Sequence, residues 1–165
     1  MPTAMNWRSC RPWPEAEIAY LTREPIDSAN LLREVGDPGL GATSLFLGTV
    51  RRGPEDGPVT SIEYSAYESM AEEELRRIVT EGLERWPAVR VAVRHRLGPV
   101  PAGEASVAVA AAAAHRVEAF AACRWTIEEV KRRAPIWKQE RLDDGTARWR
   151  ENSASGAERP PAGRA

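Results

Sequence analysis

The two lysines of this chain lie close together in the sequence and could carry chemistry. Of the 23 basic residues only Lys131 and Lys138 are lysines, and they flank the segment RRAPIW at 132–137. Arginine stays protonated in proteins, whereas a desolvated lysine can lose its proton and act as a base or nucleophile. The spacing alone is equally typical of two surface lysines at a basic helix end, where cations suit the helix dipole.

Two other clusters could bind an anion. Thr49-Val50-Arg51 ends an apolar segment after Gly48, and His115-Arg116 opens a helical pattern. Free amides and the dipole at a helix N-terminus attract anions, and an arginine adds a fork that matches phosphate. The alternative for His115-Arg116 is an ordinary helix start whose charged side chains are solvated and bind nothing. With the lysines, the clusters predict a phosphorylated small molecule held by Arg and His, with a lysine near its reactive carbon.

Composition and motif content argue against several classes of protein. A chain of 165 residues predicts one domain with its own core. The net charge of -1 disfavours a nucleic-acid binder that acts by bulk electrostatics. Cys10 and Cys123 lack metal-ligand spacing, and no P-loop, dinucleotide fingerprint or Ser-His-Asp order occurs. We therefore expect no metal or cofactor and no membrane span, and a reduced, cytoplasmic protein.

Hydrophobic periodicity divides the chain into alternating strands and helices. Residues 1–14 and 152–165 are predicted to be disordered, and 15–151 to form a single domain. Strands are expected at 18–26, 42–51, 59–68, 89–97 and 105–113. Helices are expected at 28–35, 68–86 and 115–134, the last ended by Pro135. Residues 52–58 are expected to form a mobile loop, 98–103 a turn, and 143–145 the turn of a small C-terminal hairpin. The short links favour antiparallel pairing and an α+β class.

Within these strands, two residues and one segment allow more specific structural predictions. Gly48 inside its strand predicts a bulge or a close backbone approach. His95 alternates with valines, so we expect a hydrogen-bonded, partly buried histidine and not a catalytic one. The small side chains of 105–113 predict close packing of a neighbouring element.

Several strings together resemble one family, the large, catalytic subunit of molybdopterin synthase, of the MoaE type. The resemblance runs from about Ile18 to Glu151, and its combination of F-x-G-x-V-R, AHR and K-x-x-x-P-I-W-K is specific, whereas any one motif alone is weak. The strings are GATSLFLGTVR (41–51), IEYSAYESMAEEEL (62–75), RHRLGPVPAGEASV (94–107), AAHRVEAFAACRWTIEEVKRRAPIWKQE (113–140) and DGTARW (144–149).

The resemblance implies a fold, partners and a reaction. The fold is α/β-hammerhead-like, an antiparallel sheet packed with helices, and the subunit forms a homodimer within a heterotetramer. Each large subunit receives the C-terminal Gly-Gly tail of a small ubiquitin-like subunit, which carries a thiocarboxylate. Sulfur moves from this tail to cyclic pyranopterin monophosphate, forming the dithiolene of molybdopterin without a metal. The implied substrate contacts are Phe46, Thr49, Val50, Arg51, His115, Arg116, Lys131, Lys138, Gln139 and Glu140.

Both the thiocarboxylate and the substrate phosphate are negative, so a positively lined pocket would lower the cost of bringing them together. We assign anion binding to Arg51, His115 and Arg116. Lys131 is the first candidate for chemistry, pairing with the tail and moving protons, while Lys138 orients the pterin or stabilises developing charge. Two alternatives stay open: a non-catalytic receptor for a ubiquitin-like tail, and a phosphate-binding RNA or nucleotide module.

The spacing within the predicted helix 115–134 bears on assembly. Arg116 and Lys131 are 15 positions apart, or roughly 22 Å at about 1.5 Å per residue. No proline or glycine between them would bend the helix. Because the resemblance places both residues against one substrate, we expect a two-fold dimer in which each site takes residues from both chains.

Overall fold

The computed structural model describes residues 19–52 and 57–150, without the side chain of Arg150. The two predicted disordered ends, 1–14 and 152–165, lie outside this range, as does most of the predicted loop 52–58. The described residues form three helices: α1 (Ser28–Val35), α2 (Glu68–Arg85) and α3 (Arg116–Arg133). The strands are β1 (Leu21–Thr22), β2 (Ala42–Thr49), β3 (Val59–Ala66), β4 (Arg90–Arg96), β5 (Gly98–Pro101), β6 (Ala105–Ala113), β7 (Ile136–Leu142) and β8 (Ala147–Arg150).

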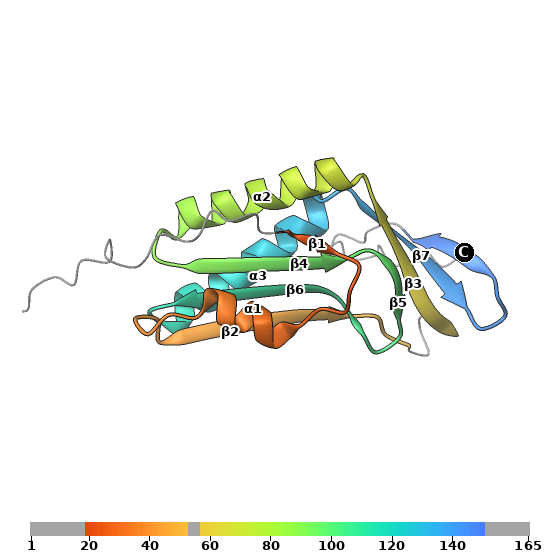
Figure 1. The fold of residues 1–165 in the computed structure, drawn as a ribbon, viewed down its shortest axis with the longest axis horizontal. Helices are drawn as coiled ribbons and strands as arrows, with labels where there is room; N and C mark the ends of the chain where they lie inside the picture. Colours follow the sequence, from red (N-terminus) through yellow and green to blue (C-terminus); the bar gives the residue numbers. More distant parts are fainter. Residues whose placement is uncertain (1–18, 53–56, 151–165) are drawn as a thin grey trace, which may run out of the picture.

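The strands divide between two sheets (Figure 1). The first sheet has the order β1-β4-β6-β2, and the second, which lies toward one end of the first, has the order β5-β3-β7-β8. All pairings are antiparallel except that of β1 with β4. The α+β class is therefore confirmed. The expectation that strands joined by short links would pair is wrong for β2 and β3, which belong to different sheets.

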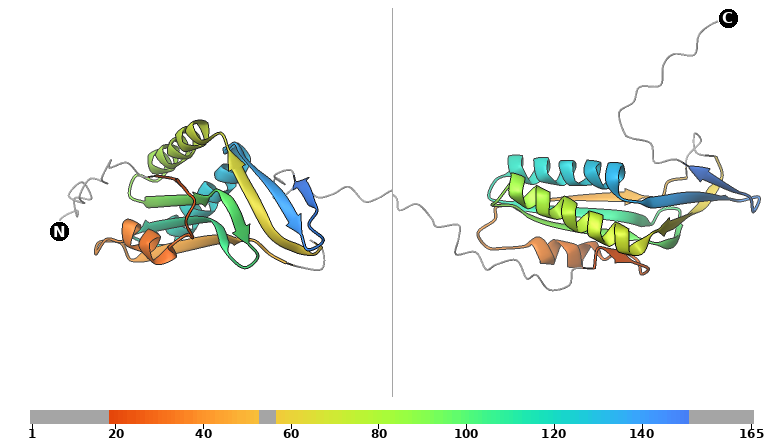
Figure 2. Two further views of the ribbon diagram at one scale, coloured as in Figure 1. Left: turned by 45° about the vertical axis from the view of Figure 1, so that its right-hand side comes forward. Right: turned by 90° about the horizontal axis from the view of Figure 1, so that it is seen from above.

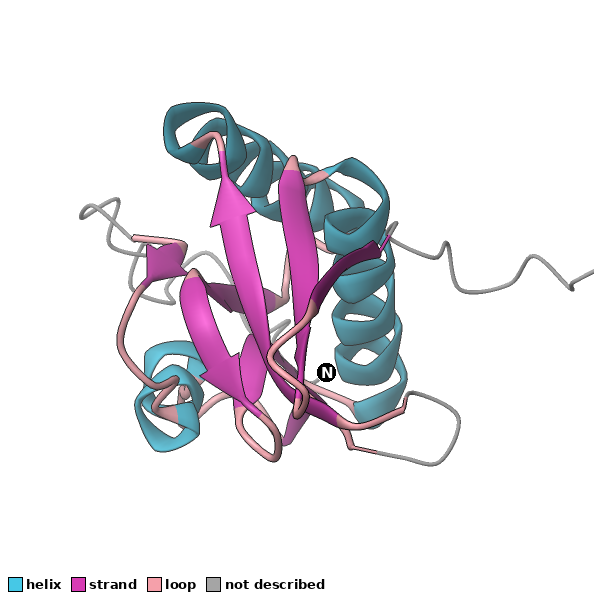
Figure 3. Ribbon diagram, turned by 90° about the vertical axis from the view of Figure 1, so that its right-hand side faces the viewer, coloured by secondary structure: helices cyan, strands magenta, loops and turns pink. Residues whose placement is uncertain are grey.

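The first sheet is covered on both faces by helices (Figures 2 and 3). Helices α2 and α3 lie on one side and α1 on the other. Strand β6 shows why: Val107 and Val109 join the core shared with α2 and α3, whereas Ala108 and Ala110 pack with Leu31 of α1. Successive side chains of a strand point to opposite faces, and small ones let a helix approach closely. The predicted close packing along 105–113 is confirmed.

Local sequence explains where α1 begins and where α3 ends. Asp27 caps α1, because its side chain accepts a hydrogen bond from the amide of Asn30 at 3.0 Å. Helix α3 ends at Arg133, just before Pro135, which cannot continue a helix. Strand β7 starts at the next residue, Ile136. No helix of the described residues is long and apolar enough to cross a membrane.

Two sequence expectations about strands need correction. Within the described part of 18–26 only Leu21–Thr22 forms a strand, and Pro25, which has no amide to donate, cannot extend it. The turn expected at 98–103 contains strand β5, which pairs with β3. Its two prolines are tolerated because β5 is an edge strand with a side that needs no donors.

Candidate active site

A cavity of about 260 Å³ lies between the two sheets and the C-terminal end of α3. Both lysines of the chain line it, Lys131 from α3 and Lys138 from β7. Pro135 ends the helix between them, so the chain turns into β7 and brings the second lysine beside the first. The residues lining the cavity are Gly48, Thr49, Val50, Arg51, Val59, Ile62, Tyr64, Ser106, Lys131, Lys138 and Glu140.

The pairing of β7 with β3 decides which side chains of β7 reach the cavity. Lys138 is opposite Tyr64 and Glu140 is opposite Ile62, and all four side chains line the cavity. Gln139 lies between the two and therefore on the opposite face of the sheet. Its predicted contact with substrate stays a prediction, and the register gives it no place in the cavity of its own chain.

Burial and charge tune the lysine on α3. Burial lowers the pKa of Lys131, and the positive charge of Lys138 lowers it further. An ammonium whose pKa is lowered gives up its proton more easily near neutral pH. Lys131 therefore has the environment of a lysine that can exchange protons with a substrate.

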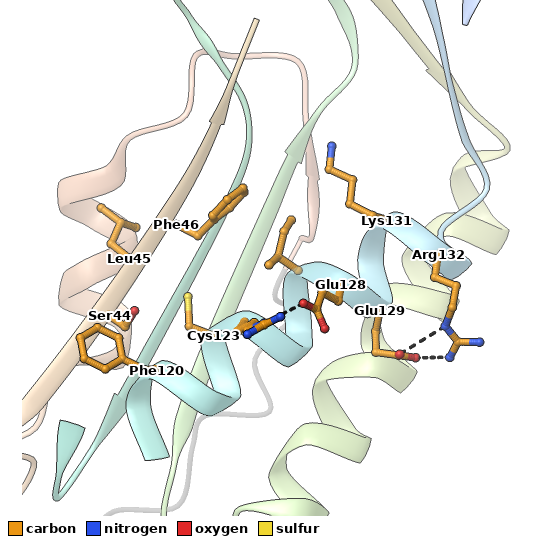
Figure 4. Close-up of a pocket in the computed structure, with 11 residues that line it drawn as sticks. Ser44, Leu45, Phe46, Phe120, Cys123, Glu128, Glu129, Lys131 and Arg132 are labelled. Carbon is orange, nitrogen blue, oxygen red and sulfur yellow. Dashed lines mark hydrogen bonds and ion pairs between the residues drawn. The ribbon is translucent and has the colours of Figure 1, made fainter. Parts of the chain in front are cut away.

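The end of α3 that carries Lys131 is anchored to α2 by arginine. Arg133 donates from Nε to Glu74 at 2.6 Å and from Nη2 to Glu81 at 2.8 Å. Fork-shaped contacts of this kind hold a side chain in one geometry. Figure 4 shows Lys131 leaving α3 away from the neighbouring pair of Arg132 and Glu129, so its amine is not engaged by that pair.

Glycine shapes the wall of the cavity that comes from β2. The register between β2 and β6 shifts between Gly48 and Thr49, which confirms the predicted bulge. A side chain on Gly48 would place its Cβ 2.6 Å from Cγ1 of Val107, a distance that real Cβ atoms do not reach. The bulge turns the chain so that Thr49, Val50 and Arg51 all line the cavity.

A wider groove adjoins the cavity at Lys131. It has a volume of about 710 Å³ and runs between β2 and α3, where Ser44 and Phe46 face Phe120 and Cys123 (Figure 4). Lys131 lines both spaces. Phe46, one of the substrate contacts that the resemblance implies, thus belongs to the groove and not to the cavity.

The thiol in this groove is unsuited to carrying sulfur. Cys123 is a free, buried thiol whose Sγ lies 3.5 Å from the carbonyl oxygen of Val109. Burial raises the pKa of Cys123. Reactive cysteines need the opposite shift, because the thiolate is the nucleophile.

The structure does not bring His115 and Arg116 to this cavity. They stand at the other end of α3, exposed, and line neither the cavity nor the groove. Helix α3 is unbroken from Arg116 to Arg133, so about 22 Å of helix separates Arg116 from Lys131. The predicted substrate contacts therefore form two groups in one chain: those at the cavity and groove, and the pair at the helix start.

His95 lies behind the cavity, as the alternation in its strand predicts. It is buried, and its Nδ1 donates to the carbonyl oxygen of Arg96 at 3.0 Å. Burial lowers the pKa of His95 to about 4, and the charge of Lys131 acts in the same direction. The ring is thus neutral at pH 7.

Five residues that line the cavity were not predicted from the sequence to do so: Gly48, Val59, Ile62, Tyr64 and Ser106. One signal was available in the sequence, since Ser106 is the single polar residue in the segment ASVAVAAAA at 105–113. Among the residues that the structure describes, no group of three or more His, Cys, Asp or Glu side chains could hold a metal ion.

Comparison with known proteins identifies the family. The family model described as MoaE protein matches residues 21–133. The chain belongs to the MoaE family. It is 43% identical over 137 residues to the molybdopterin synthase catalytic subunit of Drosophila willistoni, covering 82% of this chain and 37% of that protein. The chain thus spans well under half of the length of that relative.

Two solved structures share the fold of this MoaE-family chain. Molybdopterin synthase from Staphylococcus aureus matches with a TM-score of 0.77 and 31% identity, over 81% of this chain and 97% of that chain. A protein-protein complex of subunits 1 and 2 of molybdopterin-converting factor from Helicobacter pylori matches with a TM-score of 0.68. Its identity of 21%, over 81% of this chain and 90% of that chain, speaks for the fold alone.

Proposed function

We propose that this chain is the catalytic subunit of a molybdopterin synthase, transferring sulfur from a small ubiquitin-like subunit to cyclic pyranopterin monophosphate. The observation that carries the proposal is the meeting of Lys131 and Lys138, the two lysines of the chain, in one cavity beside Arg51. Membership of the MoaE family and the name of the Drosophila relative support the same activity.

The charges of the cavity suit the two proposed reactants. A thiocarboxylate and a phosphate are both anions, and Arg51, Lys131 and Lys138 are cations. In each transfer a carbon–sulfur bond must form at the pterin, a carbon–oxygen bond must break, and water must cleave the acyl–sulfur bond to leave a carboxylate on the tail. Lys131 would hold the tail and move the protons, because its pKa is lowered. Lys138 would orient the pterin.

The proposed sulfur donor is the C-terminal Gly-Gly thiocarboxylate of the small subunit. The Helicobacter pylori complex, which shares the fold, is an assembly of two subunits. The groove beside Phe46 gives an extended tail a route to Lys131. Removing the last two residues of the small subunit should abolish sulfur transfer, while contacts between the globular parts should still give binding.

The proposal includes a homodimer within a heterotetramer. The cavity of about 260 Å³ is smaller than a typical ligand site of roughly 300–1,000 Å³. His115 and Arg116 of a second chain would enlarge and complete it with two more anion-binding groups. The free thiol of Cys123 supports a reducing, cytoplasmic location.

The test is incubation of the protein with thiocarboxylated small subunit and cyclic pyranopterin monophosphate, followed by mass analysis for a dithiolene product. Lys131→Ala should fold normally and form no product, since Lys131 is half-buried at a helix edge. Lys131→Arg should also fail, because it keeps the charge without the proton transfer. Normal product from Lys131→Ala would instead favour a non-catalytic receptor for the tail.

A further inference from the structure

Arg133 is a largely buried arginine at the junction between the two lysines of the cavity. It is the last residue of α3 and follows Lys131 by two positions, while Lys138 comes five positions later on β7. The Arg133 side chain is 20% exposed and lines neither the cavity nor the groove. Neither the motifs nor the lysine chemistry gives it a role, yet its guanidinium lies among three carboxylates.

The guanidinium of Arg133 bridges two turns of α2. Nη1 and Nη2 donate to the two carboxylate oxygens of Glu81 at 2.5 and 2.8 Å, and Nε donates to Glu74 at 2.6 Å. Glu129 of α3 itself accepts from Nη1 at 3.3 Å. Glu74 and Glu81 are seven residues apart, which places them on one face of α2 and about 10 Å apart along its axis. A planar fork can bind both carboxylates at once, whereas the compact ammonium of a lysine cannot.

These hydrogen bonds close a frame of four elements, α3, β7, β3 and α2, the first three of which line the cavity. Ala134 and Pro135 connect α3 to β7, β7 pairs with β3, and Tyr67 connects β3 to α2. Covalent links and strand pairing thus join three corners of the frame, and Arg133 joins the fourth, from α2 back to α3. Because the two lysines stand on adjoining sides, closing the frame limits how far apart they can move.

Apolar packing alone does not specify the orientation of this helix end. Val130 and Ala134 are buried and hold it against the core. The hydrophobic effect that favours their burial is non-directional, whereas charged hydrogen bonds in fork geometry are directional. Lys131 is only partly buried, so a small rotation of the helix end would carry its amine from the cavity toward solvent.

We propose that Arg133 is a positioning residue: its hydrogen bonds to α2 hold the end of α3 in the orientation that keeps Lys131 in the cavity. The proposal rests on the proposed function for the reaction that this lysine serves. Arg76 provides a matched control, because it is 57% exposed and binds Glu73 of its own helix.

The first measurement labels the protein alone with acetic anhydride, which reacts with neutral amines. Arg133→Lys keeps the charge but loses the fork, so the labelling midpoint of Lys131 should rise toward the ordinary value of 10.5 as its amine gains solvent. Cleavage after Arg132 puts Lys131 and the substituted position on different peptides. Arg76→Lys should leave the midpoint unchanged. The wild-type midpoint in Arg133→Lys would overturn the proposal, since positive charge alone would then be sufficient.

A second variant separates positioning from electrostatics by the sign of the effect. Glu81→Ala removes a negative charge, which by itself would lower the pKa of Lys131. It also removes two of the hydrogen bonds that Arg133 makes to α2, and the resulting exposure of Lys131 should raise the labelling midpoint. Glu81 is 45% exposed, so this variant should fold, which circular dichroism verifies. A midpoint at or below that of the wild type would contradict the positioning role.

Turnover in the complex with thiocarboxylated small subunit is the third measurement. For Arg133→Lys, kcat should fall about 10- to 100-fold, the loss expected when a reacting group is displaced by about 1 Å. KM for cyclic pyranopterin monophosphate should change far less, because Arg51 and Lys138 do not belong to α3. Arg76→Lys should keep both wild-type values.

A normal kcat in Arg133→Lys, or a loss confined to KM, would overturn the proposal. Failure of the wild type to form product would instead refute the proposed function. The labelling midpoints require neither the small subunit nor the pterin, so they would still decide whether Arg133 positions Lys131.

Discussion

Lys131 combines a partly buried position with a second positive charge nearby, and both features disfavour its ammonium form. Burial is the larger cause of its lowered pKa, and Lys138 is the other. A lysine is necessary at position 131, because an arginine there would keep its proton. The chemistry thus depends on the residue type as well as on the charge.

Amine labelling can measure this effect, because the chain has only two lysines and its N-terminal amine to label. Acetic anhydride reacts with the neutral amine, so the pH dependence of labelling reports the titration of each lysine. Lys131 should label with a midpoint below the ordinary value of 10.5. Lys138→Gln removes the neighbouring charge and should raise that midpoint. Peptide mass analysis gives the two sites separately, with the unfolded protein as the reference. The same midpoint in wild type and variant would contradict the coupling.

His95 predicts a pH dependence of stability. Its pKa is about 4 in the folded protein against 6.5 for an exposed histidine. As the pH falls from 7 toward 4, the unfolded chain binds a proton that the folded protein does not. Its contribution to the free energy of unfolding should therefore be complete above about pH 6.5 and fall by about 3 kcal/mol by pH 4.

Urea denaturation at several pH values of the wild type and of His95→Gln checks this sign. Carboxylates destabilise both proteins equally in acid, so the difference between the two curves isolates the histidine. The wild type should lose more stability than the variant between pH 6.5 and 4. Parallel curves would mean that His95 is protonated in the folded protein.

At the scale of elements, the bulge in β2 places three cavity residues and depends on one glycine. Gly48→Ala should destabilise the protein by about 1–3 kcal/mol, because the new Cβ meets the buried, stiff side chain of Val107. Gly36→Ala is a matched control, since its Cβ would lie 3.4 Å or more from its neighbours and its φ is -64°. Urea midpoints of the two variants give the comparison, and equal stability would refute the steric argument.

The helices and most strands could be predicted from periodicity, because their buried faces repeat at the helical or strand spacing. Strand β5 could not, since glycine and two prolines are typical of turns and only the edge position tolerates them. The division of β2 and β3 into separate sheets depends on long-range pairing with β6 and β7.

The same limit applies to the site. Lys131 and Lys138 could be identified from rarity and spacing, whereas Tyr64 reaches the cavity only through its pairing with β7. Residue type and local spacing thus predict the reactive groups, but the rest of the cavity wall depends on contacts between distant segments.

At the scale of the whole molecule, the length of α3 separates the predicted anion binders. Arg116 and Lys131 stand near opposite ends of one unbroken helix. The described residues of one chain therefore form a cavity with lysines but without His115 and Arg116. If both groups serve one substrate, two chains must share each site, and a two-fold dimer contains two such sites.

Complementation tests this arrangement. Arg116→Ala and Lys131→Ala should each be inactive alone. After equal amounts exchange subunits at random, half of the dimers contain both variants, and each of these has one site with both residues intact. Activity should therefore return to about one quarter of the wild-type value. The measurement is product formation with the thiocarboxylated small subunit, before and after exchange.

The controls separate shared sites from failed mixing. Exchange is verified by differential isotope labelling of the two variants and native mass analysis of the mixed dimer. Mixing Arg116→Ala with His115→Ala should restore nothing, because both residues come from the same helix end and no site in the mixed dimer would have both. Recovery in the first mixture alone is expected only if the helix start of one chain serves the lysines of the other. Verified exchange without recovery would mean that each chain works with its own residues, and α3 would then have to bend or unwind when substrate binds.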